Sequence, residues 1–444
     1  MTRQPRILIV GGGYVGMYTA LRLQRKLRRG EAHVTVVDPH SYMTYQPFLP
    51  EAAAGNLEPR HVVVPLRRVL PQCEVVTGIV ESVDMDTRTA RVQPHAGPAY
   101  DLRFDHIVVA PGSVSRTLPV PGLAEAGIGF KRVEEAIHLR NHVVNQLDIA
   151  ESTTDRAIRR RALTFVFVGA GYAGVEAFAE LEDMAREACR YYRTVSPGDM
   201  RWVLVEATNR ILPEVGEDMG RYTLEQLRWR GLDVRLETRL ESIEDGVARL
   251  SDGDALPTNT LVWTAGVKPH PVLARTGLPL DDRGRLKATT HLQVEGVPGA
   301  WTAGDCAAVP DLTNPGAFTG PSAQHAVRQA KRLGDNIVAA LRGEPTAPYR
   351  HKYAGSVASL GLHKGVAQVY GVKLKGWPAW FMHRTYHVSR VPTANRKVRV
   401  VADWTLGLFF RREIVNLGSL AQPRGEFVTA AASGPAGIPA GRGQ

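Results

Sequence analysis

One local pattern occurs twice in the sequence and limits what the chain can fold into. A short apolar run, Ile7–Val10, leads into the glycine-rich stretch GGGYVG at Gly11–Gly16 and then into a helical pattern. A second apolar run, Phe165–Val168, leads in the same way into GAGYAG at Gly169–Gly174. Glycines at this spacing allow a tight turn, the approach of a pyrophosphate to the backbone, and close packing of helix on strand. Each copy therefore predicts a dinucleotide-binding βαβ unit.

An acidic residue follows each glycine loop at the end of a further apolar run. Asp38 ends the run Val34–Val37, and Glu206 ends the run Trp202–Val205. A carboxylate at this place can accept hydrogen bonds from the hydroxyls of a ribose. Glu206 also repels the 2′-phosphate of NADP, although Arg210 lies nearby, so the second loop is predicted to prefer NAD over NADP.

Apolar β-branched runs alternate with helical patterns over most of the chain. This alternation predicts an α/β fold with two Rossmann-like dinucleotide-binding domains built on parallel sheets. The chain has 444 residues, which is too long for a single ordinary core. The predicted strands are Ile7–Val10, Val34–Val37, Ile107–Ala110, Phe165–Val168, Trp202–Val205 and Leu261–Trp263, and the predicted helices are Val15–Arg28 and Ala173–Tyr192.

The order of these segments predicts a discontinuous first domain. The stretch Leu118–Glu125 reads as a crossover to a second dinucleotide fold, and Trp301–Asp305 reads as a return to the first. We therefore expect an FAD-binding domain at 1–120 and 290–345 and an NAD(H)-binding domain at 121–289. A C-terminal region at 346–421 shows no βαβ pattern. The segment 422–444, rich in Ala, Gly and Pro, is predicted to be a disordered tail.

Cysteine usage and charge narrow the functional class. The three cysteines, Cys73, Cys189 and Cys306, form no CxxC pair, and the histidines are scattered, so we expect neither a disulfide framework nor a metal site. The compartment is predicted to be reducing cytoplasm. Residues 350–444 contain 14 Lys/Arg and 3 Asp/Glu, so they carry the whole net charge of +11. This distribution predicts an anionic partner for the C-terminal region.

The paired glycine loops, together with the turns at Ala110–Gly112 and Gly304–Asp305, resemble those of the type II NADH:quinone oxidoreductases. This family belongs to the pyridine nucleotide-disulfide oxidoreductase-like flavoproteins, and the resemblance covers nearly all of residues 5–420. It implies FAD at the first loop and NADH at the second. It also implies the transfer of two electrons to a membrane quinone without proton pumping. No cysteine lies in the flavin-facing segment Tyr45–Glu51, so electrons are expected to pass directly through the flavin.

The resemblance implies a set of cofactor-binding residues. They are Gly11, Gly12, Gly13, Tyr14, Val15, Gly16, Asp38, Pro39, Gln46, Val80, Ala110, Gly112, Gly304, Asp305, Ala323, Gly169, Gly171, Ala173, Gly174, Glu206, Ala265 and Gly266.

Two further residues are implied to act in catalysis. Glu176, placed on the first turn of the helix after the second loop, corresponds to a glutamate near the nicotinamide and the flavin. Gln324 matches the first glutamine of the family motif A-Q-x-A-x-Q, whose glutamines line the quinone site. Arg328 stands at the second glutamine, and Gln329 cannot replace it, because one helical residue is a turn of about 100°. This departure leaves the electron acceptor open.

The C-terminal region mixes aromatic and basic residues and resembles a membrane-anchoring module. Its aromatic residues, among them Trp377, Trp380 and Trp404, are expected at a lipid boundary, with Arg411 and Arg412 on the headgroups. Helix breaks are expected at Pro378, Pro392 and Gly407. The resemblance implies a peripheral protein on the cytoplasmic side of the cell membrane, bound to an anionic membrane surface. The same residues also suit an ordinary core or a homodimer interface.

Two other functions remain open at this stage. One is an NADH-dependent flavoprotein reductase that passes electrons to a small acidic protein such as a ferredoxin. The other is a sensor that binds NAD(H) and flavin without catalysis. Nucleic-acid binding is not expected, because the basic C-terminal region contains no recognisable nucleic-acid module.

Overall fold

The computed structural model describes residues 4–351, 355–417 and 428. Its larger sheet has seven strands in the order β20-β8-β1-β2-β5-β6-β7. The first five strands are parallel, whereas β6 and β7 extend the sheet antiparallel from β5. In chain order these strands are β1 Arg6–Val10, β2 His33–Asp38, β5 Glu74–Asp84, β6 Thr89–Pro94, β7 Tyr100–Arg103, β8 His106–Val109 and β20 Ala300–Thr302.

The smaller sheet has five parallel strands in the order β10-β17-β11-β12-β13. Their bounds are β10 Gly127–Gly129, β11 Thr164–Val168, β12 Arg201–Val205, β13 Asp233–Arg235 and β17 Thr260–Trp263. An antiparallel sheet covers one face, with β14 Leu240–Glu244, β15 Val247–Leu250 and β16 Ala255–Pro257. The runs predicted as buried parallel strands all lie in the two parallel sheets. The predicted α/β class with two Rossmann-like folds is confirmed.

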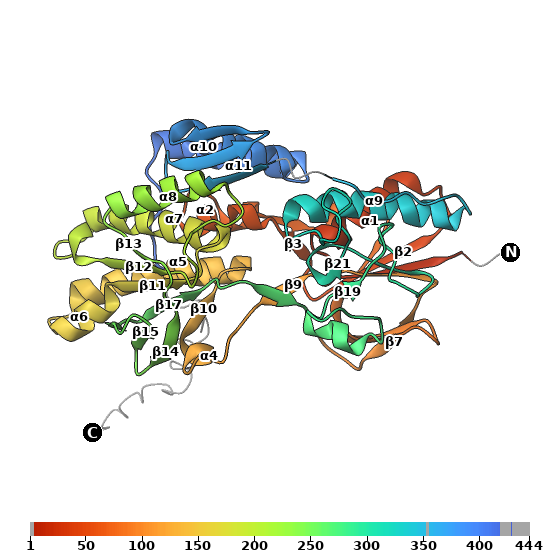
Figure 1. Ribbon diagram of the computed structural model, residues 1–444, viewed down its shortest axis with the longest axis horizontal. Coiled ribbons are helices and arrows are strands. Elements are labelled where there is room, and N and C mark those ends of the chain that lie inside the picture. Colours follow the sequence, from red (N-terminus) through yellow and green to blue (C-terminus); the bar gives the residue numbers. More distant parts are fainter. Residues whose placement is uncertain (1–3, 352–354, 418–427, 429–444) are drawn as a thin grey trace, which may run out of the picture.

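Helices cover one face of each parallel sheet (Figure 1). Over the larger sheet, α1 and α9 pack against each other, and over the smaller sheet α5 and α7 do so. The helix α8 packs on the smaller sheet near β13. The bounds of these helices are α1 Tyr14–Lys26, α5 Val133–Ser152, α7 Tyr172–Ala188, α8 Glu217–Trp229 and α9 Ala323–Leu341.

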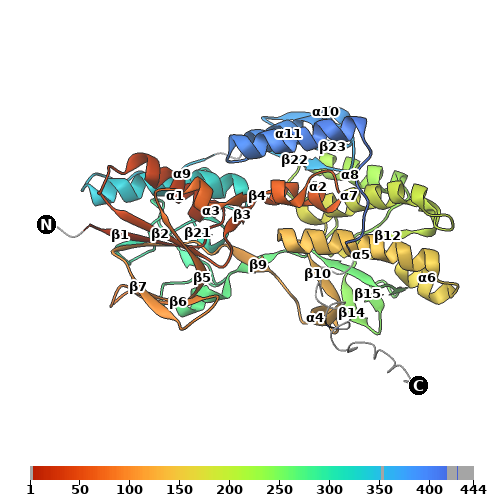
Figure 2. The ribbon, with the colours of Figure 1, turned by 180° about the vertical axis from the view of Figure 1, so that it is seen from behind.

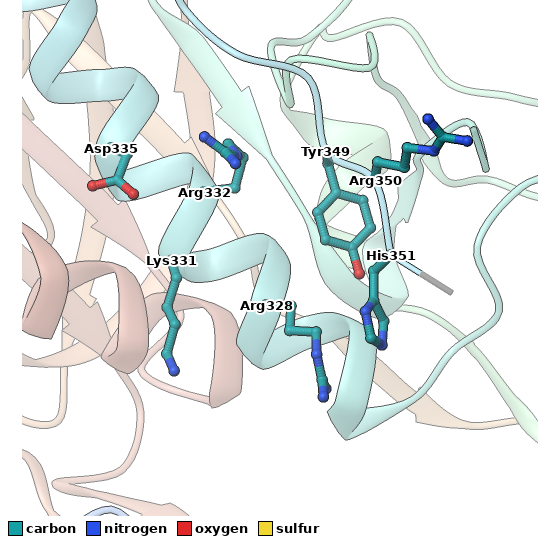
Figure 3. A pocket seen from close by; sticks show the side chains of 7 residues that line it. All are labelled: Arg328, Lys331, Arg332, Asp335, Tyr349, Arg350 and His351. Atoms are coloured by element: carbon teal, nitrogen blue, oxygen red, sulfur yellow. The ribbon is translucent and has the colours of Figure 1, made fainter. Parts of the chain in front are cut away.

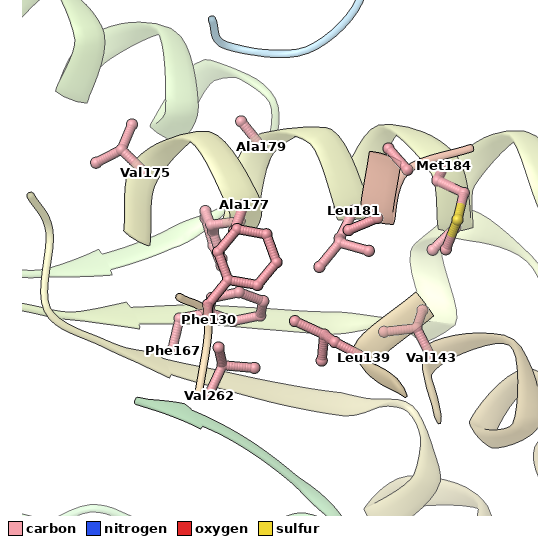
Figure 4. Close-up of a cluster of buried hydrophobic side chains, with 14 of the residues drawn as sticks. Phe130, Leu139, Val143, Phe167, Val175, Ala177, Ala179, Leu181, Met184 and Val262 are labelled. Atoms are coloured by element: carbon pink, nitrogen blue, oxygen red, sulfur yellow. The ribbon is translucent and has the colours of Figure 1, made fainter. Parts of the chain in front are cut away.

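The core between α7 and the smaller sheet follows the alternation of side chains along β11. Phe167 points toward α5 and α7, and its ring lies 5.2 Å from that of Phe178, at an edge-to-face angle (Figure 4). Val166 points to the opposite face, against the β14–β16 sheet. Full burial of each such side chain contributes about 1.5–3 kcal/mol, so both faces of the strand hold the second glycine loop in place.

A short antiparallel ladder joins the two halves of the molecule (Figures 1 and 2). It pairs β9, Ser113–Ser115, with β18, Val267–Pro269. The strand β9 follows the turn at Ala110–Gly112, and β18 follows the turn at Ala265–Gly266. The ladder therefore links the turns that lie beside the two glycine loops.

The C-terminal region packs across α7 and α8 on one side of the molecule (Figures 1 and 2). It consists of β22 Gly355–Ser359, β23 Gly365–Val369, β24 Val372–Lys375, α10 Trp377–Arg390 and α11 Ala394–Phe409. Pro392 separates the two helices as predicted, and Pro378 lies in the first turn of α10, where proline is tolerated. Gly407 lies inside α11, so the break predicted there is wrong. A single glycine costs a helix only about 1 kcal/mol.

Part of the predicted lipid boundary is instead a packed interface. Trp380 is buried, and Trp404 donates from Nε1 to Glu51 Oε2 at 2.8 Å. Arg384 lies against both indole rings and donates to the same carboxylate at 2.8 Å, which attaches the C-terminal helices to α2, Leu49–Ala53. For Trp380 the lipid-boundary expectation is wrong, because this residue is buried. The Arg384 guanidinium attracts the π-systems of both indole rings.

Arg412 also departs from the expectation for a lipid-facing residue. Its guanidinium is buried between Asp183 and Glu187, at 2.9 and 2.7 Å. Within the described part of the chain, no helix combines the length and the apolar character that crossing a bilayer requires. The predicted tail at 422–444 lies outside the described residues except for Val428.

Candidate functional site

The first glycine loop follows β1, at the point where the neighbouring strands β2 and β8 lie on opposite sides. In parallel sheets this switch point is where ligands bind. The loop and Asp38 are tied together, since Gly12 N donates to Asp38 Oδ2 at 2.6 Å and His40 N donates to Oδ1 at 2.7 Å. Burial raises the pKa of Asp38, and these two hydrogen bonds oppose the rise. Gly11 has a φ of +98°, and a side chain there would overlap the carbonyl of Ala110.

The second loop repeats this arrangement around Glu206. Ala170 N donates to Glu206 Oε2 at 2.7 Å, and Thr208 donates to Oε1 from both N and Oγ1 at 2.9 Å. Gly169 has a φ of +101° and lies against the turn at Thr264–Ala265, as Gly11 lies against Ala110. Arg210 points its guanidinium to Pro213 O at 2.9 Å. The two halves therefore present their carboxylates in matching positions.

The helices that follow the two loops begin without a side-chain cap. The residues that precede α1 and α7, Gly13 and Gly171, have no side chain that could cap the helix, and neither helix has an acidic residue in its first turn. By contrast, Ser322 caps α9 and Thr393 caps α11. Uncapped N–H groups and the helix dipole together favour an anion, such as a pyrophosphate, at the ends of α1 and α7.

The turn at Gly304–Asp305 packs directly on the first loop. A side chain at Gly304 would come within 2.6 Å of Val15, which shows how closely the turn approaches α1. Gly304 N donates to Gln329 Oε1 at 2.8 Å, and the buried Gln329 also donates to Thr319 Oγ1 at 3.0 Å. Gln329 therefore supports the turn from the inner face of α9.

A lysine bridges the two halves at Asp305. Ser113 Oγ donates to Asp305 Oδ2 at 2.7 Å, and Lys131 Nζ donates to Ser113 Oγ at 2.7 Å. Burial lowers the pKa of Lys131, and the charge of Asp305 opposes this effect. The sequence analysis missed Lys131, because a single lysine before a helix carries no motif. Gln46, a predicted residue, donates to the Lys131 carbonyl at 3.3 Å and so reaches the same place.

The remaining residues that were predicted to bind FAD lie at different depths around the first glycine loop. Pro39 follows Asp38, and its carbonyl lies 2.9 Å from His95 Nε2. Val80 is buried in β5 within the core cluster that also contains Val10, so its side chain packs below the loop. Ala323 begins α9 directly after the cap Ser322.

A line of aromatic and titratable side chains joins the first loop to α7. The ring of Tyr14 lies 6.1 Å from that of Tyr45, and the Tyr45 hydroxyl lies 3.3 Å from His387 Nδ1. The rings of His387 and His383 are 4.5 Å apart, and His383 Nε2 is 3.2 Å from Glu176 Oε1. We call these five residues the central line. The central line begins at Tyr14 on α1 and ends at Glu176 on α7, and α10 supplies its two histidines.

Glu176 departs from its predicted place on the helix. It is the fifth residue of α7, beyond the first turn, so its carboxylate does not cap the helix. Instead it accepts from Ser359 N at 2.9 Å and pairs with His383. Burial lowers the pKa of His383, but the adjacent Glu176 and the charges of Glu51 and Glu180 outweigh burial and raise it.

Gln324 lies in the first turn of α9, near the start of the C-terminal region. Its Oε1 is 2.9 Å from His351 Nε2, and its Nε2 donates to Gly355 O at 3.4 Å. Arg328 donates to the carbonyl of Gln324 at 3.1 Å. Gln324 and Gln329 therefore have different roles, because Gln329 faces the Gly304 turn. The prediction that Gln329 does not replace the missing motif glutamine is consistent with this geometry.

The residues at the first loop fit FAD. The space beside Gly13 is free, since a side chain there would meet no protein atom within 4 Å. The uncapped start of α1 suits a pyrophosphate, and Asp38 has the oxygens that a ribose requires. Gly171 is equally open at the second loop, where NADH would lie. None of the described Cys, His, Asp and Glu residues form a group that could hold a metal ion.

Comparison with known proteins adds an independent finding. Residues 5–330 match the family described as pyridine nucleotide-disulphide oxidoreductase. The chain is 30% identical over 390 residues to a type II NADH:quinone oxidoreductase of Staphylococcus aureus, covering 87% of this chain and 95% of that protein. It is 26% identical over 419 residues to a probable NADH dehydrogenase of Dictyostelium discoideum, covering 92% and 90%.

A solved structure shows the same fold over almost the whole chain. The NDH2 of Plasmodium falciparum in complex with NADH superposes with a TM-score of 0.86 at 17% identity, covering 93% of this chain and 100% of that chain. A sulfide:quinone oxidoreductase of Aquifex aeolicus covers 92% and 96%, at 16% identity and a lower TM-score of 0.68. The likeness to the first structure therefore extends beyond the two dinucleotide folds.

Proposed function

The chain belongs to the pyridine nucleotide-disulphide oxidoreductase family and, within it, to the type II NADH:quinone oxidoreductases, and from this premise we propose how its residues oxidise NADH and reduce a quinone. FAD, when bound, accepts a hydride and passes on two electrons. Gly11–Gly16 and Asp38 would hold its ADP half. Asp305, with Ser113 and Lys131, would hold the part nearer the flavin ring, because this network lies where the two halves meet.

NADH would bind along the second loop. The uncapped start of α7 takes the pyrophosphate, and Glu206 takes the ribose of the adenosine half. The turn at Ala265–Gly266 then lies beside the nicotinamide, since it borders Gly169 and leads into the ladder toward the first half. These contacts orient the nicotinamide toward the flavin, which is the main contribution that a protein makes to hydride transfer.

The reaction also needs a proton. Oxidation of one NADH and reduction of one quinone to the quinol consume one proton from the medium. We propose that Glu176 and His383 hold this proton between them, because the two groups are 3.2 Å apart and are screened from water by α10. Glu176 would act as the catalytic residue beside the nicotinamide. His383 would act as a positioning residue, and Gln324 would bind the quinone.

The central line carries this proposal, since it links the residues of the two dinucleotide loops. The test compares Glu176→Gln with the wild-type holoenzyme in two assays. Anaerobic stopped-flow follows bleaching of the flavin by NADH, and a steady-state assay follows NADH oxidation with menadione. We expect near-normal flavin content and quinone turnover reduced at least tenfold, with an altered pH profile. A wild-type flavin that NADH does not bleach would refute the function.

His383 provides a sharper test of the proton proposal. We expect His383→Gln to keep flavin content and the KM for NADH, to reduce kcat with menadione, and to flatten the pH profile. His138 on α5 offers a matched control, because it lies away from Glu176. If His383→Gln and His138→Gln have the same profile as the wild type, His383 takes no part in proton handling.

We also propose that α10 and α11 dock on an anionic membrane surface. Five large apolar side chains of α11 are exposed, namely Val398, Val401, Leu406, Leu408 and Phe409. Lys397 and Arg399 lie on the same helix and suit acidic headgroups. Trp377 and Phe381 extend the apolar surface onto α10, where their rings stack at 5.4 Å. An exposed apolar patch with adjacent cations is typical of a helix that lies in a membrane interface.

Vesicle flotation tests this docking. We expect the holoenzyme to float with vesicles containing phosphatidylglycerol and much less with pure phosphatidylcholine. Leu408→Asp/Phe409→Asp should reduce flotation at least fivefold. Ile158→Asp is the matched control, because Ile158 is exposed on α6, Arg156–Ala162, far from α11 in both views (Figures 1 and 2). Equal flotation of the double variant would contradict the proposal.

The membrane side and the assembly state are further parts of the proposal. We propose the cytoplasmic face, a compartment in which the thiols of Cys73, Cys189 and Cys306 would remain free, as they are in the structure. We also propose a homodimer. In it, the exposed apolar surface of α10 and α11 would contact a second copy of the chain instead of a membrane. Analytical ultracentrifugation with and without detergent distinguishes a dimer from a monomer.

A further inference from the structure

A basic pocket lies between α9 and the segment 349–351 (Figure 3). Its volume is about 220 Å³. Arg328, Lys331, Arg332 and Asp335 line it from α9, at the helical spacing that puts them on one face. Tyr349, Arg350 and His351 line it from the facing segment. The sequence analysis had noted only Arg328, as the departure from the glutamine motif.

The charges in this pocket are strongly unbalanced. Asp335 is its one carboxylate, and Arg22 holds it through two hydrogen bonds of 2.8 and 2.9 Å. Within the described part of the chain, the four cations of the pocket have no ion-pair partner of their own. Burial lowers the pKa of Lys331, and the positive charges of Arg390 and Arg328 lower it further. A bound anion would relieve this repulsion.

The wall of the pocket is fixed by hydrogen bonds. The Tyr349 hydroxyl lies 2.8 Å from His325 Nδ1, and His351 Nε2 lies 2.9 Å from Gln324 Oε1. Tyr349 is buried, so the segment that presents Arg350 and His351 is held against α9. The open side of the pocket therefore presents guanidinium and ammonium donors in a fixed arrangement.

This pocket is separate from the dinucleotide sites. Gln329, the neighbour of Arg328, faces the Gly304 turn on the FAD side. Arg328 is rotated from it by about 100° around α9, and so it points away from that turn. The volume is also below the roughly 300–1,000 Å³ of pockets that enclose a whole drug-sized ligand. It suits one small anionic group.

We propose that this pocket binds a phosphate group, either on a small soluble ester or on the headgroup of an acidic phospholipid. A phosphate has several acceptor oxygens and is negatively charged, with about 1.5–2 charges as a monoester and a single charge as the diester of a phospholipid headgroup. Arginine guanidinium groups recognise it with paired, parallel hydrogen bonds. Arg328, Arg332 and Arg350 provide three such groups around one cavity.

Isothermal titration calorimetry of the purified holoenzyme tests the soluble source. The probes are inorganic phosphate and glycerol 3-phosphate, with sodium chloride of equal ionic strength as the blank. We expect Arg332→Gln/Arg350→Gln to weaken binding at least tenfold. Arg156→Gln/Arg160→Gln on α6 removes the same charge from an exposed helix and should leave binding unchanged. Arg332→Lys/Arg350→Lys should restore part of the affinity.

Flotation with vesicles tests the lipid source. If soluble phosphates do not bind, we expect vesicles containing phosphatidylglycerol to bind the holoenzyme in a way that Arg332→Gln/Arg350→Gln weakens and the α6 pair does not. Either pattern supports the pocket. The proposal is overturned if neither probe binds, or if the pocket variant and the α6 control bind equally.

Binding of an anion in the pocket would affect Gln324, because His351 lines the pocket and contacts Gln324 directly. This consequence rests on the proposed role of Gln324 in quinone binding. We expect saturating phosphate to change the KM for menadione at least twofold in the wild type and not in Arg332→Gln/Arg350→Gln. An unchanged KM, with calorimetric binding intact, would refute the coupling and leave the phosphate site standing.

Discussion

Arg328 and Gln329 are neighbours in the sequence, but they serve different surfaces of α9. Gln329 is fully buried and connects Gly304 N to Thr319 Oγ1. Arg328 lines the basic pocket. The rotation of about 100° per helical residue separates a structural amide from a charged group on a single helix. For a single residue, its identity therefore decides whether the turn that packs on the first glycine loop is supported.

The first prediction concerns Gln329. Gln329→Leu leaves the Gly304 N–H and the Thr319 hydroxyl without this partner, at a cost of about 1–3 kcal/mol for each buried group. We therefore expect a lower thermal unfolding midpoint and faster loss of FAD, which flavin fluorescence measures. Gln226→Leu on α8 is the control and should behave as the wild type. Retention of FAD at the wild-type rate would show that Gln329 does not support the Gly304 turn.

The second prediction concerns Glu206 and the choice of nicotinamide cofactor. Glu206→Gln keeps the shape of the side chain and its acceptor oxygen for Ala170 N, but it removes the negative charge. Repulsion of the NADPH 2′-phosphate then falls. We expect the ratio of kcat/KM for NADH to kcat/KM for NADPH to decrease about tenfold, which corresponds to about 1.4 kcal/mol. An unchanged ratio would place the source of discrimination elsewhere.

Whether the sequence could predict a pair of interacting residues depended on how far apart the two residues lie along the chain. Asp38 and Glu206 each lie in the same βαβ unit as their glycine loop, so the local pattern was sufficient to identify these carboxylates. The pair His383–Glu176 joins distant segments, and no pattern in either segment points to the other. Lys131 was missed for the same reason.

At the scale of elements, α7 is unusual because it buries three carboxylates. Glu176, Glu180 and Glu182 are all buried, and their main partners come from outside the helix. Ser359 of β22 donates to Glu176 from N and to Glu180 from Oγ, and Arg230 pairs with Glu182. Buried carboxylates need such partners, so the C-terminal sheet completes this helix.

The third prediction follows from Glu180. Burial raises the pKa of Glu180 to about 7, with the charge of Glu51 adding to the rise, whereas the unfolded value is 4.5. The folded state then holds more protons than the unfolded state between these values, so stability falls as pH rises through this window. The slope is at most about 1.4 kcal/mol per pH unit. Glu180→Gln has no such titration and should lose less stability over the same range.

Urea unfolding midpoints at several pH values check this third prediction. Gln at 180 can accept from Asn56 Nδ2 and donate to Ser359 Oγ, so both contacts can be kept. Asp183, Arg412 and Glu51 remain in both proteins and cancel in the comparison. Parallel pH profiles for the wild type and the variant would contradict a raised pKa at Glu180.

The elements were predicted most reliably where apolar runs alternate with helical patterns, and least reliably near the C-terminus. The six strands predicted from apolar runs lie in the two sheets, whereas β5, β6, β7, β10 and β13 were not predicted. The helices α10 and α11 were harder, because the pattern around Trp380 and Trp404 favoured a lipid boundary but also suits packed residues. Trp404 donates to Glu51, and Arg384, which contacts both indole rings, donates to the same carboxylate. Glu51 lies far from both tryptophans in the sequence.

At the scale of the whole molecule, charge is separated along the chain. The first 349 residues have a net charge of zero, and the last fifth of the chain carries the whole net charge of +11. In space, its described elements β22–β24, α10 and α11 form a layer along one side (Figure 2). NADH comes from the aqueous phase, whereas a long-chain quinone lies in the lipid. The proposed docking of this layer on a membrane would therefore separate the sources of the two substrates.

The fourth prediction follows from this separation. The attraction between exposed cations and an acidic bilayer is screened as the Debye length shrinks from about 30 Å at 0.01 M salt to about 3 Å at 1 M. We expect high salt to reduce NADH oxidation at least fivefold when a long-chain quinone is embedded in phosphatidylglycerol vesicles. Reduction of the flavin by NADH, followed by stopped-flow, should change less than twofold. The proposed contacts of the dinucleotide loops with their ligands are backbone N–H groups and glycines rather than exposed cations. Turnover with water-soluble menadione should also persist, since it needs no vesicle. If salt inhibits all three assays equally, the effect lies in NADH binding, and membrane docking through the C-terminal charge is refuted.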